Sequence, residues 1–574
     1  MTDVLEPIQV TQRPRTTRSQ VVRRRSLAVG GALAVLVWAL SRAVPDDGAV
    51  VNRGGATLFD DMLVRALDPR LDAEFLRIVT EATLITLAFA ALGAAGALVI
   101  GLAGGLVLSD VVWTRRPPVW VRAVRAGLRA VLVAVRSIHE LIWALLLVSV
   151  LGLDPLVAVL ALALPFGAQT AQVFGETFDT VRTAGYSALR RSGAPRTSGI
   201  LYALLPGASP VLLSYSFYRF ECSLRSTVLL GFVGVGGLGQ ELVVSLQSRN
   251  WEEVWTLVGV LMVLSALVEA WSARIRREVG PRLQAPTRAD GEGALSAVGA
   301  RPQTPSSRRP WTRFSLLVGL PGLVLCWVAA DVSFSGLVDP VTWDLTRDLL
   351  ADLVPPALPA GGLGELAGAV LDTLAMAVLA MSCAVIITLV LGPWAVHLTR
   401  NGPRPHGVSS ALRWILRLAA RLLLLLLRSV PPTIWAVVAL FGLFPGILPG
   451  AVALGLYSAG ILGRLVAEAW ESLDLSPRDA LVRNGTPRGI ASIAAVVPGS
   501  LQQLVSYTLY RFEVSVRDTA VVGVVGAAGL GRLFAENLAV FRFPVVSSLL
   551  LASFATSAAV ELFSRRVRKS LRSG

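Results

Sequence analysis

The sequence is poor in the residues that build disulfide frameworks and metal centres. Its 574 residues include only three cysteines and three histidines. The cysteines are far apart in the chain, and the histidines form no cluster with them. We therefore expect neither a disulfide framework nor a zinc site. The residues concerned are Cys222, Cys326, Cys383, His139, His397 and His406.

Charged residues are also scarce. They make up 16% of the chain, whereas 54% is hydrophobic and the mean hydropathy is +0.64. This composition indicates a polytopic membrane protein surrounded by lipid. The formal net charge of +15 could suggest a nucleic-acid partner. Because the basic residues lie in short clusters between apolar runs, as the positive-inside rule requires, we expect no nucleic acid.

Two absences bear on enzymatic activity. The chain has no G-x-x-x-x-G-K-[ST] loop, so it cannot supply ATP hydrolysis by that motif. It also has no paired nucleophile and base and no cluster of metal ligands. We therefore predict that the chain is not an enzyme and binds no cofactor itself.

What the sequence does contain is an internal duplication. The stretch YRFECSLRSTVLLGFVGVGGLG begins at Tyr218, and YRFEVSVRDTAVVGVVGAAGLG begins at Tyr510, 292 residues later. The same shift relates Arg136 to Arg428 and many other pairs. One offset shared by so many positions indicates two homologous halves.

Each half contains apolar runs long enough to cross about 30 Å of hydrocarbon as a helix. In the first half they lie at 26–44, 78–108, 128–151, 156–174, 200–217 and 254–271. In the second half they lie at 314–330, 366–396, 416–441, 447–467, 490–507 and 545–563. The run at 26–44 follows a basic stretch and imitates a signal peptide, but with so many later spans we expect a membrane helix. The fold class is therefore all-α, with about six transmembrane helices in each half.

The charges between the runs predict the topology. The N-terminal tail, the segment between the halves and the C-terminal tail are basic, so we expect all three in the cytoplasm. The segments after the first run of each half are acidic and should face outward. Both halves then run in the same direction, around an axis along the membrane normal.

The predicted organisation has five parts. A cytoplasmic tail at 1–25 precedes a first half at 26–273, and a cytoplasmic linker at 274–313 leads to a second half at 314–564, which ends in a basic tail at 565–574. The linker is rich in Pro, Ser, Gly and Arg, a composition that cannot bury a core.

A repeated loop lies between the fourth and fifth runs of each half. It reads SALRRSGAPRTSGILYALLPG from Ser187 and DALVRNGTPRGIASIAAVVPG from Asp479. In both copies a short helix with alanine precedes a glycine that can end it sharply. The positions that we single out are Ser187, Ala188, Leu189, Arg190 and Gly193, with Asp479, Ala480, Leu481, Arg483 and Gly485.

With these loops the chain resembles the integral membrane permeases of bacterial ABC importers. Their E-A-A-x-x-x-G loop docks on an ATPase subunit, although neither copy here has the glutamate. RSIHELIWALLLV from Arg136, RSVPPTIWAVVAL from Arg428 and the YRFE stretches resemble the phosphonate-transport permeases within that family. One departure is His139, where the family usually has the proline that the second copy keeps as Pro431. The resemblance implies a type I importer permease in the bacterial cytoplasmic membrane, with two halves fused in one chain.

The segment from Gly234 to Gly239 also fits the G-x-G-x-x-G pattern of a dinucleotide-binding turn. That motif needs a strand before it and a helix after it, whereas this segment follows a membrane span, and the second copy lacks the middle glycine. Two interpretations remain: a place along the translocation path near the gate, as the resemblance implies, or close backbone packing. The glycines are Gly234, Gly236, Gly237 and Gly239, with Gly526, Gly529 and Gly531.

Charged residues recur beside these glycines, at the expected outer end of the fifth span. They are Arg219, Glu221 and Arg225 in the first copy, and Arg511, Glu513 and Arg517 in the second. The Glu and the second Arg of each copy are four residues apart, so we expect each pair to bond on one helix face. Either the arginines attract a tetrahedral oxyanion, or the pairs brace the gate. Asp518 in place of Ser226 makes the two halves unequal.

The sequence thus predicts the permease of an ATP-driven importer for phosphonate or a related phosphorus oxyanion. The resemblance implies two ATPase subunits, which carry ATP and Mg, and an extracytoplasmic solute-binding protein. An importer for another solute, such as an amino acid or osmolyte, and an ion-coupled secondary transporter remain as alternatives.

Overall fold

The computed structural model describes residues 18–44, 50–113, 118–180, 184–279, 310–396 and 408–573. The start of the predicted N-terminal tail and residues 280–309 of the predicted linker lie outside this part of the chain. The described residues form helices, with a single isolated bridge between Val51 and Leu443. The all-α prediction is confirmed.

The two halves contain corresponding helices. The first half comprises α1 (Arg18–Ala43), α2 (Ala56–Val64), α3 (Ala73–Leu108), α4 (Val119–Ser137), α5 (Glu140–Leu151), α6 (Pro155–Thr180), α7 (Ala184–Arg191), α8 (Arg196–Gly199), α9 (Leu205–Leu230), α10 (Leu238–Gln247) and α11 (Trp251–Val279). The second comprises α12 (Pro310–Ala329), α13 (Ser335–Val338), α14 (Pro340–Asp352), α15 (Gly362–Ala395), α16 (Val408–Ser429), α17 (Pro432–Gly442), α18 (Ile447–Ser472), α19 (Ser476–Arg483), α20 (Arg488–Val524), α21 (Leu530–Ala539) and α22 (Phe543–Ser573). The ends of α11 and α12 show that part of the segment predicted as linker is helical.

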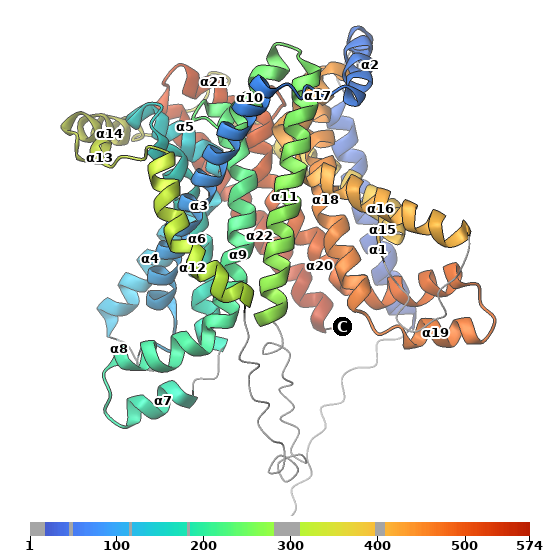
Figure 1. Ribbon diagram of the computed structural model, residues 1–574, viewed down its shortest axis with the longest axis horizontal. Helices are drawn as coiled ribbons and strands as arrows, with labels where there is room; N and C mark the ends of the chain where they lie inside the picture. Colours follow the sequence, from blue (N-terminus) through green and yellow to red (C-terminus); the bar gives the residue numbers. More distant parts are fainter. Residues whose placement is uncertain are drawn as a thin grey trace, which may run out of the picture.

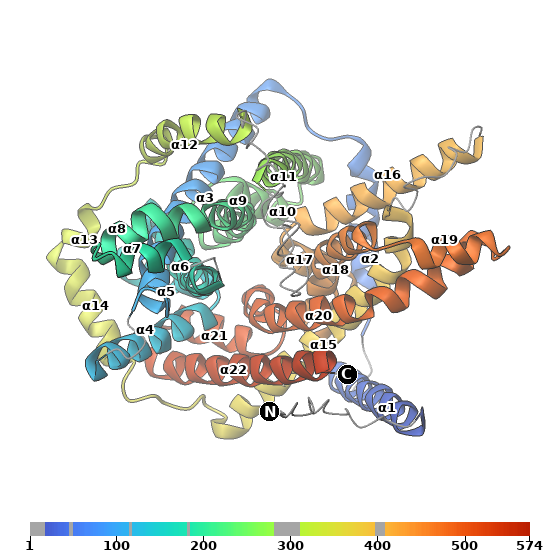
Figure 2. The same ribbon diagram turned by 90° about the horizontal axis from the view of Figure 1, so that it is seen from below.

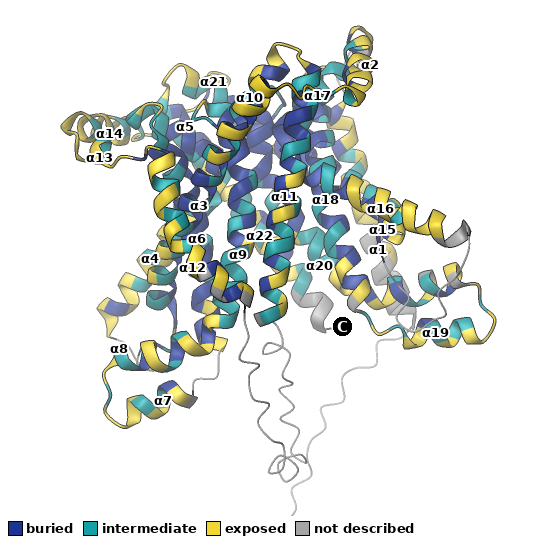
Figure 3. Cartoon of the chain, in the orientation of Figure 1, coloured by how far each residue is buried: buried dark blue, intermediate teal, exposed yellow. Residues whose placement is uncertain are grey.

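The halves run in parallel. In Figure 1, α7 and α19 lie at the lower edge on opposite flanks, whereas α10 and α21 lie at the upper edge. The described ends of the chain and of the linker also lie at the lower edge. A view from below places the two halves around a central region (Figure 2). Buried residues concentrate in the helices that meet in the upper half of the molecule (Figure 3).

Eight helices of the described residues are long and apolar enough to cross a membrane, or ten spans if each of two bent pairs counts as one. The remaining two predicted spans correspond to shorter apolar stretches, Gly30–Ala43 in α1 and Leu317–Ala329 in α12. The third predicted span of each half is not one straight helix. The chain bends by 95° between α4 and α5, and by 97° between α16 and α17.

The bends have local causes. In the second half Pro431 and Pro432 form the start of α17, since proline fits a first helical turn but cannot continue the preceding helix. In the first half His139 takes this place, and its Nδ1 accepts a hydrogen bond from the backbone N–H of Leu141 at 3.1 Å. A histidine cap therefore starts α5 where prolines start α17.

The first helix of each half packs against the other half. The end of α1 buries Ala39 and Ala43 against α15 and α18, and Arg42 pairs with Asp372 of α15 at 2.6 Å. Reciprocally, α12 packs against α3 and α11, where Trp271 Nε1 donates to Ser315 Oγ at 2.9 Å. The halves are therefore interlocked by an exchange of helices.

Candidate functional site: a central arginine-lined cavity

A cavity of about 540 Å³ lies between the two halves. Its walls come from α9 and α20, with contributions from α6, α18 and the bends before α5 and α17. Eight arginines line it, against four carboxylates. The arginines are Arg136, Arg219, Arg225, Arg276, Arg428, Arg464, Arg511 and Arg517, and the carboxylates are Glu140, Glu221, Glu468 and Asp518. The cavity therefore carries an excess of positive charge.

The charged motif lies inside the fifth span rather than at its outer end, so that prediction is wrong. The span runs from Arg196 to Val233 in the first half, and its counterpart in the second half runs from Gly489 to Val524. The predicted runs stop at the first charge of the motif. The helices continue past these charged residues because their side chains pair with other protein groups or face the cavity. In neither place are they exposed to lipid.

In the first half, Arg219 and Glu221 are nearly fully buried. The guanidinium of Arg219 donates to the Tyr215 hydroxyl and lies 4.6 Å from the centre of the Phe166 ring. The predicted pair of Glu221 with Arg225 is confirmed. Glu221 also pairs with Arg464 of the second half at 3.2 Å. Arg219, in contrast, has no carboxylate partner among the described residues.

In the second half the same motif has different partners. Arg511 donates to Ser458 Oγ at 3.0 Å and lies 3.6 Å from Asp518 Oδ2. Glu513 pairs with Arg568 at 2.7 Å, not with Arg517, so the predicted pair is wrong here. Arg517 instead donates to the carbonyl oxygen of Arg136 in the first half at 3.0 Å.

Reciprocal ion pairs join the halves beside the cavity. Arg428 of α16 pairs with Glu269 of α11, and Arg136 of α4 pairs with Glu561 of α22 at 3.1 Å. The two pairs correspond to each other under the 292-residue shift. Sequence reasoning noted the two arginines only as repeat anchors and missed the glutamates, which the same shift could have revealed.

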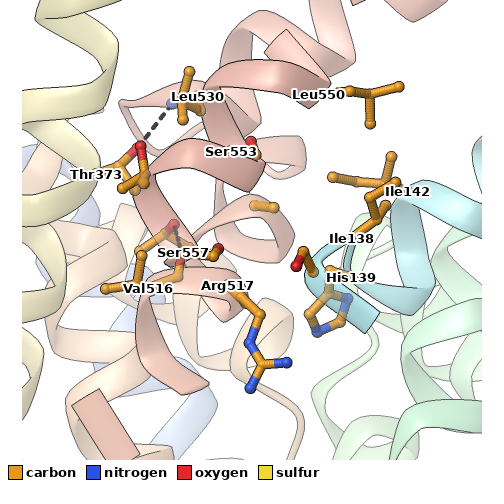
Figure 4. Close-up of a pocket in the computed structure, with 14 residues that line it drawn as sticks. Ile138, His139, Ile142, Thr373, Val516, Arg517, Leu530, Leu550, Ser553 and Ser557 are labelled. Carbon is orange, nitrogen blue, oxygen red and sulfur yellow. Dashed lines mark hydrogen bonds between the residues drawn. The ribbon is translucent and has the colours of Figure 1, made fainter. Parts of the chain in front are cut away.

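One wall of the cavity has no counterpart in the other half. There His139 Nε2 lies 3.6 Å from Asp518 Oδ1, and the Ser226 hydroxyl donates to Glu140 at 2.5 Å. Figure 4 shows His139 at the start of α5 and Arg517 on α20 beside a smaller pocket, which has a volume of about 20 Å³. This wall brings together one histidine and two carboxylates from both halves.

The cavity is closed at one end by apolar side chains. Leu229 and Val521, which correspond under the repeat shift, pack together with Leu141 on the side of α10 and α21. From Leu229 the lining follows α9 back to Val211, a distance of about 27 Å along a helix. The cavity therefore extends from this closure toward the side on which α7 and α19 lie.

The predicted docking loops form two matching short helices on that side. Ser187, Ala188, Leu189 and Arg190 lie in α7, and Asp479, Ala480, Leu481 and Arg483 lie in α19. In both, the alanine and the final glycine are exposed. Both helices therefore present small residues on the surface, far from the cavity.

Each of these two helices ends in a Schellman motif, in which a residue with left-handed backbone closes the last turn. Gly193 and Gly485 have φ of 88° and 85°. The N–H of Ala194 donates to the carbonyl of Leu189 at 3.1 Å, and the N–H of Thr486 donates to that of Leu481 at 3.1 Å. A Cβ at either position would meet no atom within 4 Å, so space does not explain the glycine. The left-handed backbone conformation does.

Comparisons with known proteins identify the family. A model of the binding-protein-dependent transport system inner membrane component matches the chain twice, at residues 119–280 and 405–572. The chain belongs to this family. The permease is 31% identical over 455 residues to the phosphate-import permease protein PhnE of Mycolicibacterium smegmatis, covering 78% of each chain. It is 32% identical to the phosphite transport system permease protein PtxC of Stutzerimonas stutzeri, covering 45% of this chain and 90% of the relative.

Among solved structures, the permease is similar to the MetNI methionine ABC transporter, with 20% identity and a TM-score of 0.33 over 37% of this chain and 99% of that chain. The two family matches confirm the duplication, and the family makes the chain a multi-pass transport subunit of the inner membrane rather than an enzyme.

The glycine segments of the permease lie at the closed end, and none of their glycines lines the cavity. Gly234, Gly236, Gly237, Gly526 and Gly529 have positive φ. A Cβ on Gly239 would lie 2.0 Å from the carbonyl oxygen of Val228, and one on Gly531 would lie 2.6 Å from that of Ala520. Of the two interpretations of the glycine segments, these contacts favour close backbone packing. The segments nevertheless lie next to the apolar closure of the cavity.

Proposed function

We propose that the permease translocates a phosphorus oxyanion, such as phosphate, phosphite or a phosphonate, in an ATP-driven importer. The observation that carries this proposal is the cavity between the halves, where arginines outnumber carboxylates. A guanidinium presents a rigid fork of donors that suits tetrahedral oxyanions. Relatives whose names specify phosphate import and phosphite transport support the same class of solute.

The energy would come from partner subunits. We propose that two ATPase subunits, which bind ATP and Mg, dock at α7 and α19, and that this chain binds neither. These helices, the chain termini and the linker would then face the cytoplasm. A solute-binding protein would deliver the oxyanion on the opposite side, above the apolar closure. Alternating access would open that closure when the ATPase subunits draw the two docking helices together.

The test is solute-stimulated ATPase activity of the reconstituted complex, with its ATPase and binding protein. Phosphonates, phosphite, phosphate and amino acids are compared. We expect stimulation by a phosphorus oxyanion, lost when Gly193 and Gly485 are both replaced by bulky residues. Stimulation by an amino acid alone would contradict the phosphorus oxyanion as solute but would still support an ATP-driven importer. A chain that assembles with no ATPase would contradict the importer itself and favour a secondary transporter.

A further inference from the structure

The asymmetric wall of the cavity offers a specific chemistry. Asp518 occupies the position that is Ser226 in the first half, and His139 and Glu140 stand where the second half has Pro431 and Pro432. The carboxylates of Asp518 and Glu140 therefore have no carboxylate at the corresponding positions of the other half, which are Ser226 and Pro432. A carboxylate facing an anion pathway is repulsive unless it accepts a hydrogen from the anion.

Asp518 has unused acceptor capacity. Its two ion contacts, to His139 Nε2 and Arg511 Nη2, are both 3.6 Å long, which exceeds hydrogen-bond distance. Arg517 from the same helix and Tyr457 from α18 line the cavity with it. Glu140 differs, because the Ser226 hydroxyl already donates to it. Asp518 is thus the less occupied carboxylate acceptor of this wall.

Donors for the same solute lie in the same cavity. Arg219 and Arg511 correspond under the repeat shift, and each is at least 95% buried. The Nε–H of each has no hydrogen-bond partner among the described residues. Buried guanidinium donors without partners are costly unless a ligand satisfies them. An oxyanion would accept from these groups through its charged oxygens.

Resting on the proposed function, we infer that Asp518 selects the protonated form of the solute. Its carboxylate accepts the P–OH hydrogen of a phosphorus oxyanion whose ionised oxygens bind the arginines. An oxyanion without a proton, such as sulfate, places a charged oxygen against this carboxylate and is rejected. A buried acceptor discriminates in this way for two reasons. A solute without the proton leaves the carboxylate without a hydrogen-bond donor, and its charged oxygen is repelled by the carboxylate.

The test measures binding to the purified full chain in lipid nanodiscs without the binding protein, which would impose its own selection. Binding of phosphate, phosphite and methylphosphonate is measured directly, and binding of radiolabelled phosphate is also competed with unlabelled phosphate and sulfate. The variants are Asp518→Asn, which keeps the shape, Asp518→Glu, which keeps the carboxylate, and Asp372→Asn. The last is a matched control, because Asp372 pairs with Arg42 away from the cavity.

We expect the wild type, Asp518→Glu and Asp372→Asn to bind phosphate and to reject sulfate. Asp518→Asn should improve competition by sulfate relative to phosphate by roughly tenfold or more. An unchanged ratio in Asp518→Asn would overturn the inference, and so would a wild type that binds sulfate as well as phosphate, even if the variant failed to fold. Binding of neither phosphate, phosphite nor methylphosphonate to the wild type and the control would instead overturn the proposed function.

Discussion

The two halves carry the same charged motif on corresponding helices, yet they pair it differently. In the first half, Glu221 bonds Arg225 and also Arg464 from the other half. The residue that corresponds to Arg464 is Gln172, which offers no charge to Glu513. Glu513 instead pairs with Arg568, and Arg517 donates to a backbone carbonyl. One neutral residue in a neighbouring helix thus changes the partners of an identical motif.

The largest expected effect tests the reciprocal ion pairs between the halves. Glu269→Gln removes the ion-pair partner of the buried Arg428. Two arginines, Arg464 and Arg225, then remain near it, against the more weakly interacting carboxylate of Glu221. Glu561→Gln leaves a more exposed Arg136, which still donates to Gln172. We expect Glu269→Gln to lower the free energy of unfolding by about 3 kcal/mol and Glu561→Gln by less.

Thermal unfolding of the purified chain in nanodiscs measures this difference. The exposed Glu536→Gln serves as the control, since its pair with Arg532 lies at the surface. Equal losses for the two inner glutamates would contradict the asymmetry.

The second prediction compares Arg219 with Arg511. Arg219 has no described carboxylate partner, whereas Arg511 lies beside Asp518. We expect Arg219→Gln to weaken the apparent affinity for the oxyanion by about ten- to a hundredfold, and Arg511→Gln to weaken it less. Uptake kinetics of the complete transporter supply the measurement, with the exposed Arg532→Gln as control. A larger effect of Arg511→Gln would contradict the prediction and indicate that Arg511 contributes more to oxyanion binding than Arg219.

The third prediction expects equality instead of difference. Gly193→Ala and Gly485→Ala each place a Cβ on a left-handed residue, at a local cost of about 1–2 kcal/mol, with no further clash. Stimulated ATPase activity should fall by the same few-fold factor in both. Gly489→Ala is the control, because Gly489 lies in the helix α20 and has equally free surroundings. Unequal losses would indicate that the two docking helices contribute differently.

The smallest effect concerns the starts of α3 and α15. Asp72 caps α3 by accepting from the N–H of Phe75 at 3.1 Å, whereas the corresponding cap of α15 is Gly361, which has no side chain. The bond from Arg70 and then that from Phe75 lower the pKa of Asp72 below its usual range. Its contribution is therefore present at neutral pH and is lost as the pH falls through that lowered pKa. The hydrogen-exchange protection factors of the first turn of α3, which correct for the pH dependence of intrinsic exchange, should fall on acidification more than those of α15.

The sequence predicted the features that depend on local pattern or repetition. The duplication, the short helices that end at Gly193 and Gly485, and the ion pair of Glu221 with Arg225 follow from spacing alone, whereas docking on an ATPase subunit stays a prediction. The bends were missed because each run was treated as one span by its average hydropathy, although Glu140 in the first run and Pro431 and Pro432 in the second interrupt it. The true length of α9 and α20 was missed because a charged residue in the sequence is normally taken to mark the end of a membrane span. Here the charged side chains are buried against the other half. Glu513 was misassigned because its partner, Arg568, lies in another helix.

The exchange of first helices between the halves has a consequence for how the chain is made. As α1 leaves the ribosome, the surface on α15 and α18 that covers Ala39 and Ala43 has not yet been synthesised. The first half likewise completes its outer layer only when α12 arrives from beyond the linker. Membrane insertion can proceed helix by helix, but neither half reaches its final packing before the other is present. Biogenesis of the two halves is thus a single, mutually dependent event.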